Sequence, residues 1–207
     1  RSDAVGYYGY LRAVFINHDL GHERPNATYL HETPDGTLNK YFAGEAVMLL
    51  PFFLAAHGWA HVSGHETDGL SSPYVCAIGL AGLVYALFGL LAFRALLRRL
   101  AIEEPVLAAV LLTIGFGGGG VQYASIQPGW SHVYSFCMVS VFLLLTARLA
   151  EHPQLRRYAV WGLSLGMILL LRPVNGLVLL ALPVVLGNGT GSFLRAFTGR
   201  WGPMLAA

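Results

Sequence analysis

The chain has 207 residues, of which 55% are hydrophobic and 12% are charged, and its formal net charge is +2. A soluble domain carries roughly 25% charged residues, so this composition excludes an ordinary soluble domain and predicts an all-α, polytopic membrane helical bundle. The arginines are scattered at the ends of apolar segments, which excludes a nucleic-acid-binding surface. Because the chain opens on Arg1 rather than methionine and stops at Ala207 within an apolar pattern, we expect a fragment of a longer chain.

The first predicted domain, residues 1–71, is an outer-face loop that carries one helix. Residues 1–40 are polar and contain turn residues around Pro25 and Pro34, which are typical of a loop. Residues 42–62 are apolar and long enough to form a helix.

The second predicted domain, residues 72–207, is a membrane helical bundle. Charged or glycine-rich stretches separate its apolar runs, which predict helices at about 73–97, 105–123, 132–149, 158–171 and 174–187. The last two runs are shorter than the roughly 20 residues that a membrane span needs. Broken helices around binding sites are often short in this way.

An arginine and a proline separate the last two predicted helices, in the run Arg172-Pro173-Val174-Asn175-Gly176. Lipid offers an arginine no partner, so Arg172 must face a protein cavity or a bound anion, unless it reaches lipid headgroups at the surface. Pro173 ends the helix and frees backbone groups that line something polar. The pattern indicates a site for a phosphate-bearing ligand at a membrane surface.

Basic residues predict the orientation of the helices, because loops rich in arginine and lysine stay in the cytoplasm. These residues are Arg94, Arg98, Arg99, Arg148, Arg156, Arg157, Arg195 and Arg200. Alternating the helices from this starting point puts residues 1–71, the loop 124–131 and Arg172 on the outer, periplasmic side of the cytoplasmic membrane.

The segment 42–62 cannot cross the membrane in this arrangement, because the chain is outside on both sides of it. We therefore expect a juxtamembrane amphipathic helix on the outer surface. Glu45, His57 and His61 fit such a surface helix better than a lipid-facing span. The alternative is a simple spanning helix.

Four short motifs follow one another along the chain. They are Ser2-Asp3-Ala4-Val5-Gly6-Tyr7-Tyr8-Gly9-Tyr10, Asn39-Lys40-Tyr41-Phe42-Ala43-Gly44, Gln127-Pro128-Gly129-Trp130-Ser131-His132 and Arg172-Pro173-Val174-Asn175. Their order and spacing resemble those of polyprenyl-phosphate-sugar-dependent glycosyltransferases of the glycosyltransferase-C superfamily, which include protein O-mannosyltransferases and bacterial aminoarabinose–lipid A transferases. The chain departs from that pattern at Ala4, where the family often has a second acid, and in the second motif, which lacks a proline.

The resemblance implies transfer of a sugar from a polyprenyl-phosphate donor to an acceptor hydroxyl at the outer face. Asp3 would be the catalytic base that takes the proton of the acceptor, and Lys40 and Arg172 would neutralise the phosphate. The alternative roles are an acid at a helix start for Asp3 and interfacial snorkelling for Lys40.

Three further residues are candidate substrate-binding groups by the same resemblance. His132 would donate a hydrogen bond to the acceptor or the phosphate, or simply begin a helix. Tyr7 would stack on a sugar ring, or belong to an aromatic belt at the membrane interface. Asn175 is a candidate through its place in the fourth motif.

We expect no cofactor. His57, His61 and His65 recur every four residues next to Glu66, a spacing that would suit a divalent metal on one helix face. Gly64 interrupts the helix there, so a hydrated helix face is the default interpretation.

Two other classes of function stay open. A non-catalytic, glycosyltransferase-like subunit would act as a scaffold in a larger membrane complex. A transporter would use a broken helix at Arg172-Pro173, but the internal repeat and mid-membrane charges typical of transporters are not found. The expected partners are a lipid-linked sugar donor, membrane lipid and, for a scaffold, other membrane subunits.

Overall fold

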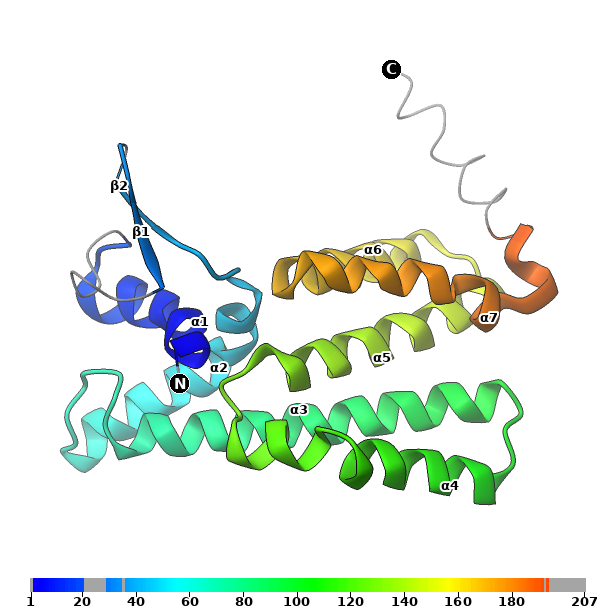
Figure 1. Cartoon of the computed structure of the whole chain (residues 1–207), viewed down its shortest axis with the longest axis horizontal. Coiled ribbons are helices and arrows are strands. Elements are labelled where there is room, and N and C mark those ends of the chain that lie inside the picture. The colour runs from blue at the N-terminus through cyan, green and yellow to red at the C-terminus, as the bar shows by residue number, and fades with distance from the viewer. Residues whose placement is uncertain (1, 21–28, 35, 192, 194–207) are drawn as a thin grey trace.

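The computed structural model describes residues 2–20, 29–34, 36–191 and 193, and this part of the chain is mostly helical (Figure 1). Its α-helices are α1 (Ser2–Arg12), α2 (Gly44–Ser63), α3 (Ser72–Arg99), α4 (Glu104–Leu112), α5 (Ser131–Glu151), α6 (Leu155–Leu171) and α7 (Leu182–Leu186). The π-helical turns are η1 (Ala13–Asn17), η2 (Thr113–Gly117) and η3 (Gln122–Ile126), and the 3-10 segments are η4 (Pro173–Ala181) and η5 (Gly187–Gly189). Strands β1 (Leu30–Thr33) and β2 (Gly36–Asn39) form a hairpin. Pro25, Arg195 and Arg200 lie outside the described residues.

Three helices, α2, α3 and α5, are long and apolar enough to cross a membrane. Shorter apolar helical stretches cover Glu104–Gly117 and Pro173–Leu186. Large apolar side chains stay exposed on the outside of the bundle, among them Leu87, Phe88, Leu163 and Leu180. Such a surface suits lipid rather than water, so the helical fold and the apolar spans agree with the composition.

The prediction that residues 1–40 form a loop is wrong in part, because they contain the helix α1 and the β1–β2 hairpin. Tyr7, Tyr8 and Leu11 are buried on one side of α1. This spacing is that of one helix face. Glycines and polar residues surround these three side chains in the sequence. The average polarity of the segment therefore does not reveal the helical periodicity.

The hairpin is antiparallel and is hydrogen-bonded to α1. Its register places Leu30 opposite Asn39 and Thr33 opposite Gly36. The Asn39 side-chain amide donates a hydrogen bond to the Gly6 carbonyl at 2.8 Å. The residues that follow β2 are therefore held against α1.

Helix α3 is the long axis of the molecule, and α2 lies antiparallel along its first half (Figure 1). Near the start of α3, the Tyr74 hydroxyl is 2.6 Å from Nδ1 of His57 at the far end of α2. Further along, the Tyr85 hydroxyl donates to the Met48 carbonyl near the beginning of α2 at 2.8 Å. The two contacts show that α2 spans the stretch of α3 between Tyr74 and Tyr85.

Helix α5 covers the second half of α3, and two glycines of α3 let α5 and the loop before it approach closely. A Cβ on Gly82 would lie 2.6 Å from Cβ of Pro128, and one on Gly89 would lie 2.7 Å from the Phe136 ring. Small residues at such crossings allow close helix packing within a membrane bundle.

The predicted helix 105–123 is broken at its glycine tract. The α-helix α4 ends at Leu112, and the chain continues through η2 and η3 on either side of Gly118. A Cβ on Gly120 would lie 2.4 Å from the Gly115 carbonyl oxygen, so only glycine fits where the chain folds back. The glycines therefore permit a break in this helix.

The break predicted between the last two apolar runs lies at Arg172, where α6 ends and η4 begins with Pro173. Arg172 is extended, with φ −157° and ψ 116°. Gly176 lies back against α6, since a Cβ there would be 2.9 Å from the Leu169 side chain. The chain therefore reverses direction at Arg172.

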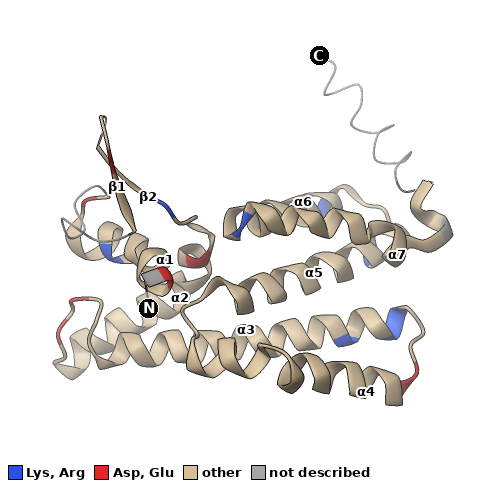
Figure 2. Ribbon diagram, in the orientation of Figure 1, with Lys and Arg blue, Asp and Glu red and all other residues tan. Residues whose placement is uncertain are grey.

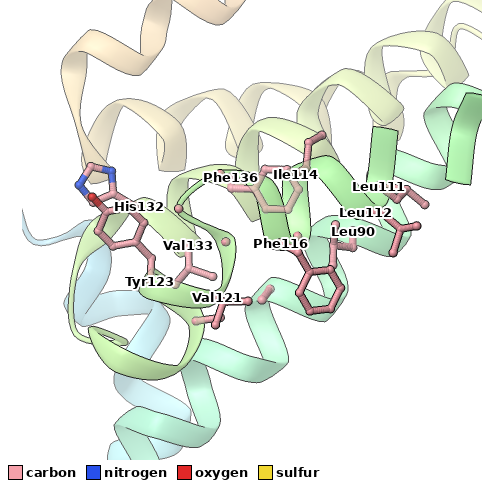
Figure 3. A pocket seen from close by; sticks show the side chains of 16 residues that line it. Leu90, Leu111, Leu112, Ile114, Phe116, Val121, Tyr123, His132, Val133 and Phe136 are labelled. Atoms are coloured by element: carbon pink, nitrogen blue, oxygen red, sulfur yellow. The ribbon is translucent and has the colours of Figure 1, made fainter. Parts of the chain in front are cut away.

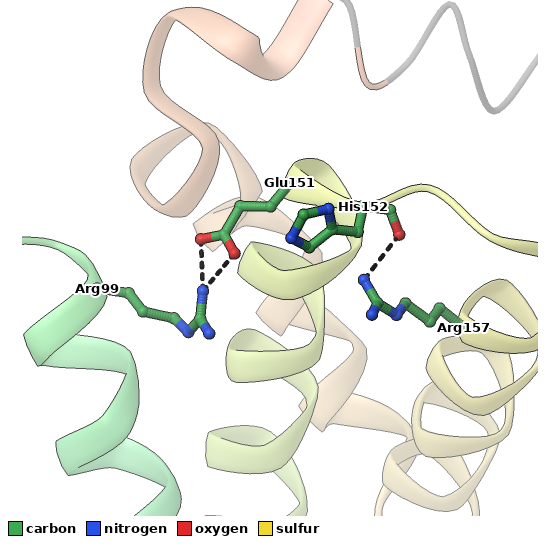
Figure 4. A network of polar contacts seen from close by, with 4 residues as sticks. All are labelled: Arg99, Glu151, His152 and Arg157. Carbon is green, nitrogen blue, oxygen red and sulfur yellow. Dashed lines mark hydrogen bonds and ion pairs between the residues drawn. The ribbon is translucent and has the colours of Figure 1, made fainter.

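Charged residues lie mostly in the N-terminal elements and near the ends of the long helices (Figure 2). At one end of the bundle, Arg99 at the end of α3 forms an ion pair with Glu151 at the end of α5 (Figure 4). Arg157 near the start of α6 donates to the His152 carbonyl at 3.0 Å. This network brings together, at one end of the bundle, arginines that the sequence predicted to lie on the same side of the membrane.

Candidate functional site

Beside the middle of α3, the structure brings together α1, the start of α2, the start of α5 and the end of α6. The close approaches occur at glycines. A Cβ on Gly44 would lie 2.4 Å from the backbone nitrogen of Leu171. A Cβ on Gly129 would lie 3.0 Å from Cβ of Ala4. Larger residues at either glycine would push these segments apart, so the sequence allows them to meet here.

Asp3 lies in the first turn of α1 and is linked to the segment before α2. The Tyr41 hydroxyl donates a hydrogen bond to Oδ1 of Asp3. The exposed Lys40 places its Nζ 5.2 Å from the centroid of the Tyr41 ring. Asp3 and Lys40 are therefore brought to the same aromatic side chain, although the sequence separates them by most of the N-terminal region.

Tyr7 connects α1 to α5. It is buried, and Oγ of Ser131 donates a hydrogen bond to its hydroxyl at 3.2 Å. Burial raises the pKa of the Tyr7 phenol above its ordinary value, and the Ser131 hydrogen bond lowers it by less. The charges of Glu45, Arg172 and Asp3 also act on this phenol. The group is therefore neutral near neutral pH and close to all three charges.

His132, in the first turn of α5, lies between aromatic rings and charged side chains. Its ring centroid is 4.1 Å from that of Tyr123 and 6.1 Å from that of Trp130, in stacked arrangements. The charges of Arg172 and Asp3 both act on the His132 ring. The half-buried Arg172 directly follows α6, whose last residue, Leu171, packs against Gly44 at the start of α2.

Asn175 fixes the turn after Arg172. Its side-chain amide donates to Oγ of Ser135 at 2.9 Å, and its backbone nitrogen donates to the Arg172 carbonyl at 2.9 Å. Ser135 is one helical turn after Ser131 on α5. Asn175 therefore anchors the chain reversal to α5, one turn deeper than the contact with Tyr7.

Glu45, in the first turn of α2, is the acid of this cluster that the sequence analysis did not include in the site. Its exposed fraction is 0%. Both carboxylate oxygens are buried without a hydrogen-bond partner among the described residues. Glu45 therefore lies inside the protein and not on an exposed face of α2. The sequence signal that could have identified Glu45 as a candidate site residue is an acid at the start of an apolar run, directly after the motif that contains Lys40.

Burying a carboxyl group without a partner is costly. Native proteins pair nearly all their buried polar atoms, so an exception calls for an explanation. The charge of Asp3 also acts on Glu45. Two neighbouring carboxyl groups carry one negative charge at a lower electrostatic cost than two negative charges. The site therefore has an ionisable pair in two environments, with Asp3 hydrogen-bonded to Tyr41 and Glu45 enclosed.

An apolar cavity of about 640 Å³ lies beside the charged cluster. It is bounded by α3, by the glycine break after α4 and by the first turns of α5 (Figure 3). Its lining includes His132 and Tyr123, which stand at one end of the cavity in Figure 3. His132 thus faces both the charged cluster and the cavity.

His57 and His61 of α2 and His65, which follows this helix, are not arranged as a metal site among the described residues. His57 contacts the Tyr74 hydroxyl, and Nδ1 of His65 is 2.8 Å from Oγ of Ser63. In the part of the chain that the structure describes, no group of three or more His, Cys, Asp and Glu side chains is arranged to hold a metal ion.

Comparisons of the chain with protein families, with curated proteins and with solved structures found no match.

Proposed function

We propose that this chain is part of a membrane glycosyltransferase that moves a sugar from a polyprenyl-phosphate donor to an acceptor hydroxyl. The reaction would take place at the outer face of the cytoplasmic membrane. The observation that carries the proposal is the close packing of three segments that bear the candidate residues: α1 with Asp3 and Tyr7, the start of α5 with His132, and the end of α6 before Arg172.

The chemistry needs a base for the acceptor and a cation for the leaving phosphate. In the proposed step, the acceptor oxygen forms a bond to the anomeric carbon while the bond from that carbon to the phosphate oxygen breaks. The acceptor proton passes to the carboxylate of Asp3. The departing polyprenyl phosphate gains a negative charge, which Arg172 stabilises with a planar fork of donors.

Lys40, His132 and Tyr7 have supporting roles in this proposal. Lys40 adds a second positive charge near the phosphate from the segment before α2. His132 and the neutral Tyr7 phenol supply hydrogen bonds to the sugar or the phosphate. Asn175 holds the Arg172 turn against α5 through Ser135.

The position of the cluster supports the sidedness of the proposal. The arginines Arg99 and Arg157 lie at one end of the bundle, away from the site. If that end is cytoplasmic, as basic residues favour, the site lies on the outer side of it. Helix α2 runs antiparallel along the first half of α3, and its start lies beside the site.

The test is a transfer assay with the purified full-length protein and a radiolabelled polyprenyl-phosphate sugar. Asp3→Asn keeps the size of the side chain but removes the base, so transfer should fall by about 10²–10⁴-fold. Arg172→Lys should impair donor use less than Arg172→Ala, because lysine keeps the charge and loses the fork. Arg156→Ala, at the other end of α6, is the matched control and should transfer normally.

Two results would contradict the proposal in different ways. Unchanged transfer by Asp3→Asn would remove Asp3 from the mechanism. Absence of transfer by the folded wild-type protein with any donor would favour the scaffold function, in which the fold supports a larger membrane complex.

A further inference from the structure

The tip of the β1–β2 hairpin projects away from α1 and α2, and no third strand pairs with it among the described residues (Figure 1). A two-stranded hairpin is marginally stable in water unless further strands or a helix support it. The hydrogen bond to α1 is at the base of the hairpin, at Asn39. An open strand edge is a template for another strand, because its outward backbone N–H and C=O groups have no partner in the sheet.

The register shows which backbone groups of β2 point outward. The backbone nitrogen of Lys40 donates to the Tyr29 carbonyl at 3.0 Å, so this pair is hydrogen-bonded. Hydrogen-bonded and non-hydrogen-bonded pairs alternate along an antiparallel ladder. The register therefore pairs the backbone groups of Leu38 within the hairpin and turns those of Thr37 and Asn39 toward the open edge.

The two strands of the hairpin differ in charge. β1 contains the acid Glu32, whereas β2 contains no charged residue. Proteins protect open strand edges with charged side chains, so the edge of β2 lacks a protection that β1 has. Leu38 in β2 is 60% exposed, and the half-buried Thr37 and Asn39 lie on the other face of the strand. The edge of β2 is therefore uncharged and carries an uncovered apolar side chain.

The open edge of β2 is complementary to itself. Its outward backbone groups belong to Thr37 and Asn39, which lie one residue before and one residue after Leu38. A two-fold axis beside Leu38 would therefore bring each outward N–H opposite an outward C=O of an identical strand. A second copy of this chain thus provides the partner groups that this edge needs.

We propose that β2 pairs antiparallel with β2 of a second copy of this chain, which gives a four-stranded sheet across a two-fold axis. Leu38 faces Leu38 of the second copy, so the two exposed side chains cover each other. Thr37 faces Asn39 of the second copy, and each such pair exchanges two backbone hydrogen bonds. This contact is closed by its symmetry, so it gives a dimer and not a fibre.

The test is disulfide trapping of the full-length protein in membranes. Cys76 and Cys137 are replaced by alanine, and Leu38→Cys supplies a single cysteine. Residues that face each other in a non-hydrogen-bonded antiparallel pair have Cα atoms about 4.5 Å apart, which is within the range of a disulfide. Mild oxidation should therefore give a covalent dimer.

His31→Cys is the matched control, because His31 lies opposite Leu38 in the hairpin. In the four-stranded sheet, the two copies of this position are separated by three strand spacings, or about 14 Å. A disulfide cannot span that distance. The His31→Cys variant should therefore form at least about tenfold less dimer than the Leu38→Cys variant.

A charge exchange at Leu38 tests the same contact without oxidation. Leu38→Lys alone or Leu38→Glu alone places like charges opposite each other, which is unfavourable across an antiparallel pair. Co-purification of two differently tagged copies should therefore fall about tenfold for either variant. Co-expression of the lysine variant with the glutamate variant should restore co-purification, and this restoration shows that both variants fold.

Three results would overturn the inference. They are absence of dimer from Leu38→Cys, equal dimer from Leu38→Cys and His31→Cys, and co-purification of either charged variant with itself at the wild-type level. The inference does not depend on the proposed function, because none of these measurements requires sugar transfer.

Discussion

Glu45 lies in the first turn of α2 with both carboxylate oxygens enclosed, beside Asp3 and near the buried Tyr7. An acid without a partner is unfavourable for folding, and such groups persist where function requires them. Asp3 accepts a hydrogen bond from Tyr41, whereas Glu45 is enclosed without a hydrogen-bond partner among the described residues. This arrangement suits Asp3 as the base of the proposed reaction.

Replacing Glu45 with the apolar methionine should therefore raise stability. Glu45→Met removes a carboxyl without a partner and keeps a chain of similar length, so the midpoint of thermal unfolding should rise by about 2–4 °C, equivalent to about 1 kcal/mol. Thermal unfolding in detergent measures the change. Glu66→Met, at an exposed loop position, is the control and should shift the midpoint little. A lower midpoint for Glu45→Met would show that the carboxyl has a structural partner.

At the scale of elements, the site depends on contacts between helix ends. The start of α2 meets the end of α6 through Gly44, and the loop before α5 meets α1 through Gly129. Each contact joins segments that lie far apart in the sequence, and each requires a residue without a side chain. The position of Arg172 relative to Asp3 is therefore set by glycine packing at these junctions.

Two alanine substitutions on α2 should have opposite effects. Gly44→Ala would place a methyl group 2.4 Å from the backbone nitrogen of Leu171, so the two helices must separate, at a cost of about 1–3 kcal/mol. Gly58→Ala, on the same helix with no atom within 4 Å, should stabilise by about 0.4–1 kcal/mol because it restricts the unfolded chain. Denaturant titration compares the two variants. Equal stability would show that α2 and α6 do not touch at Gly44.

The whole molecule has an ion-pair network at one end, and the candidate site lies about halfway along α3 from it. Helix α3 has 28 residues, which is about 42 Å of helix and longer than the roughly 30 Å of bilayer hydrocarbon. Its first half packs against α2 and its second half against α5. A helix of this length can extend at one end beyond the bilayer hydrocarbon. That end lies in the part of the molecule that contains α1 and α2.

Cysteine labelling of intact membranes should detect this polarity. Cys76 and Cys137 are first replaced by alanine, and single cysteines are placed at Glu32, Asp68 and His152. We expect a membrane-impermeant thiol reagent to label the cysteines placed at Glu32 and Asp68 from the same side of the membrane. The cysteine placed at His152 should be labelled from the other side. Labelling of Glu32 and Asp68 from opposite sides would show that α2 crosses the membrane.

Sequence reasoning proposed several candidate site residues but could not predict their surroundings. Asp3, Tyr7, His132 and Arg172 were proposed from short motifs, and the structure packs the segments that bear them together beside the middle of α3. The enclosure of Glu45 was not predicted, because an acid in an apolar run is equally compatible with a solvent-exposed helix face and with an enclosed site. The helix α1 was missed, because its buried face consists of few residues among glycines and polar groups.

The sequence by itself determined the membrane class of the protein, the break at the glycine tract and the break at Arg172-Pro173. These are local properties: hydropathy follows from composition, and a missing Cβ or a missing backbone N–H acts on its own segment. The tertiary structure alone decided which groups meet. Ser131 and Tyr7 are 124 positions apart and share a hydrogen bond, and Glu45 is enclosed because α2 presses against the end of α6. Burial depends on neighbours brought from elsewhere in the chain, so no pattern within one segment could reveal it.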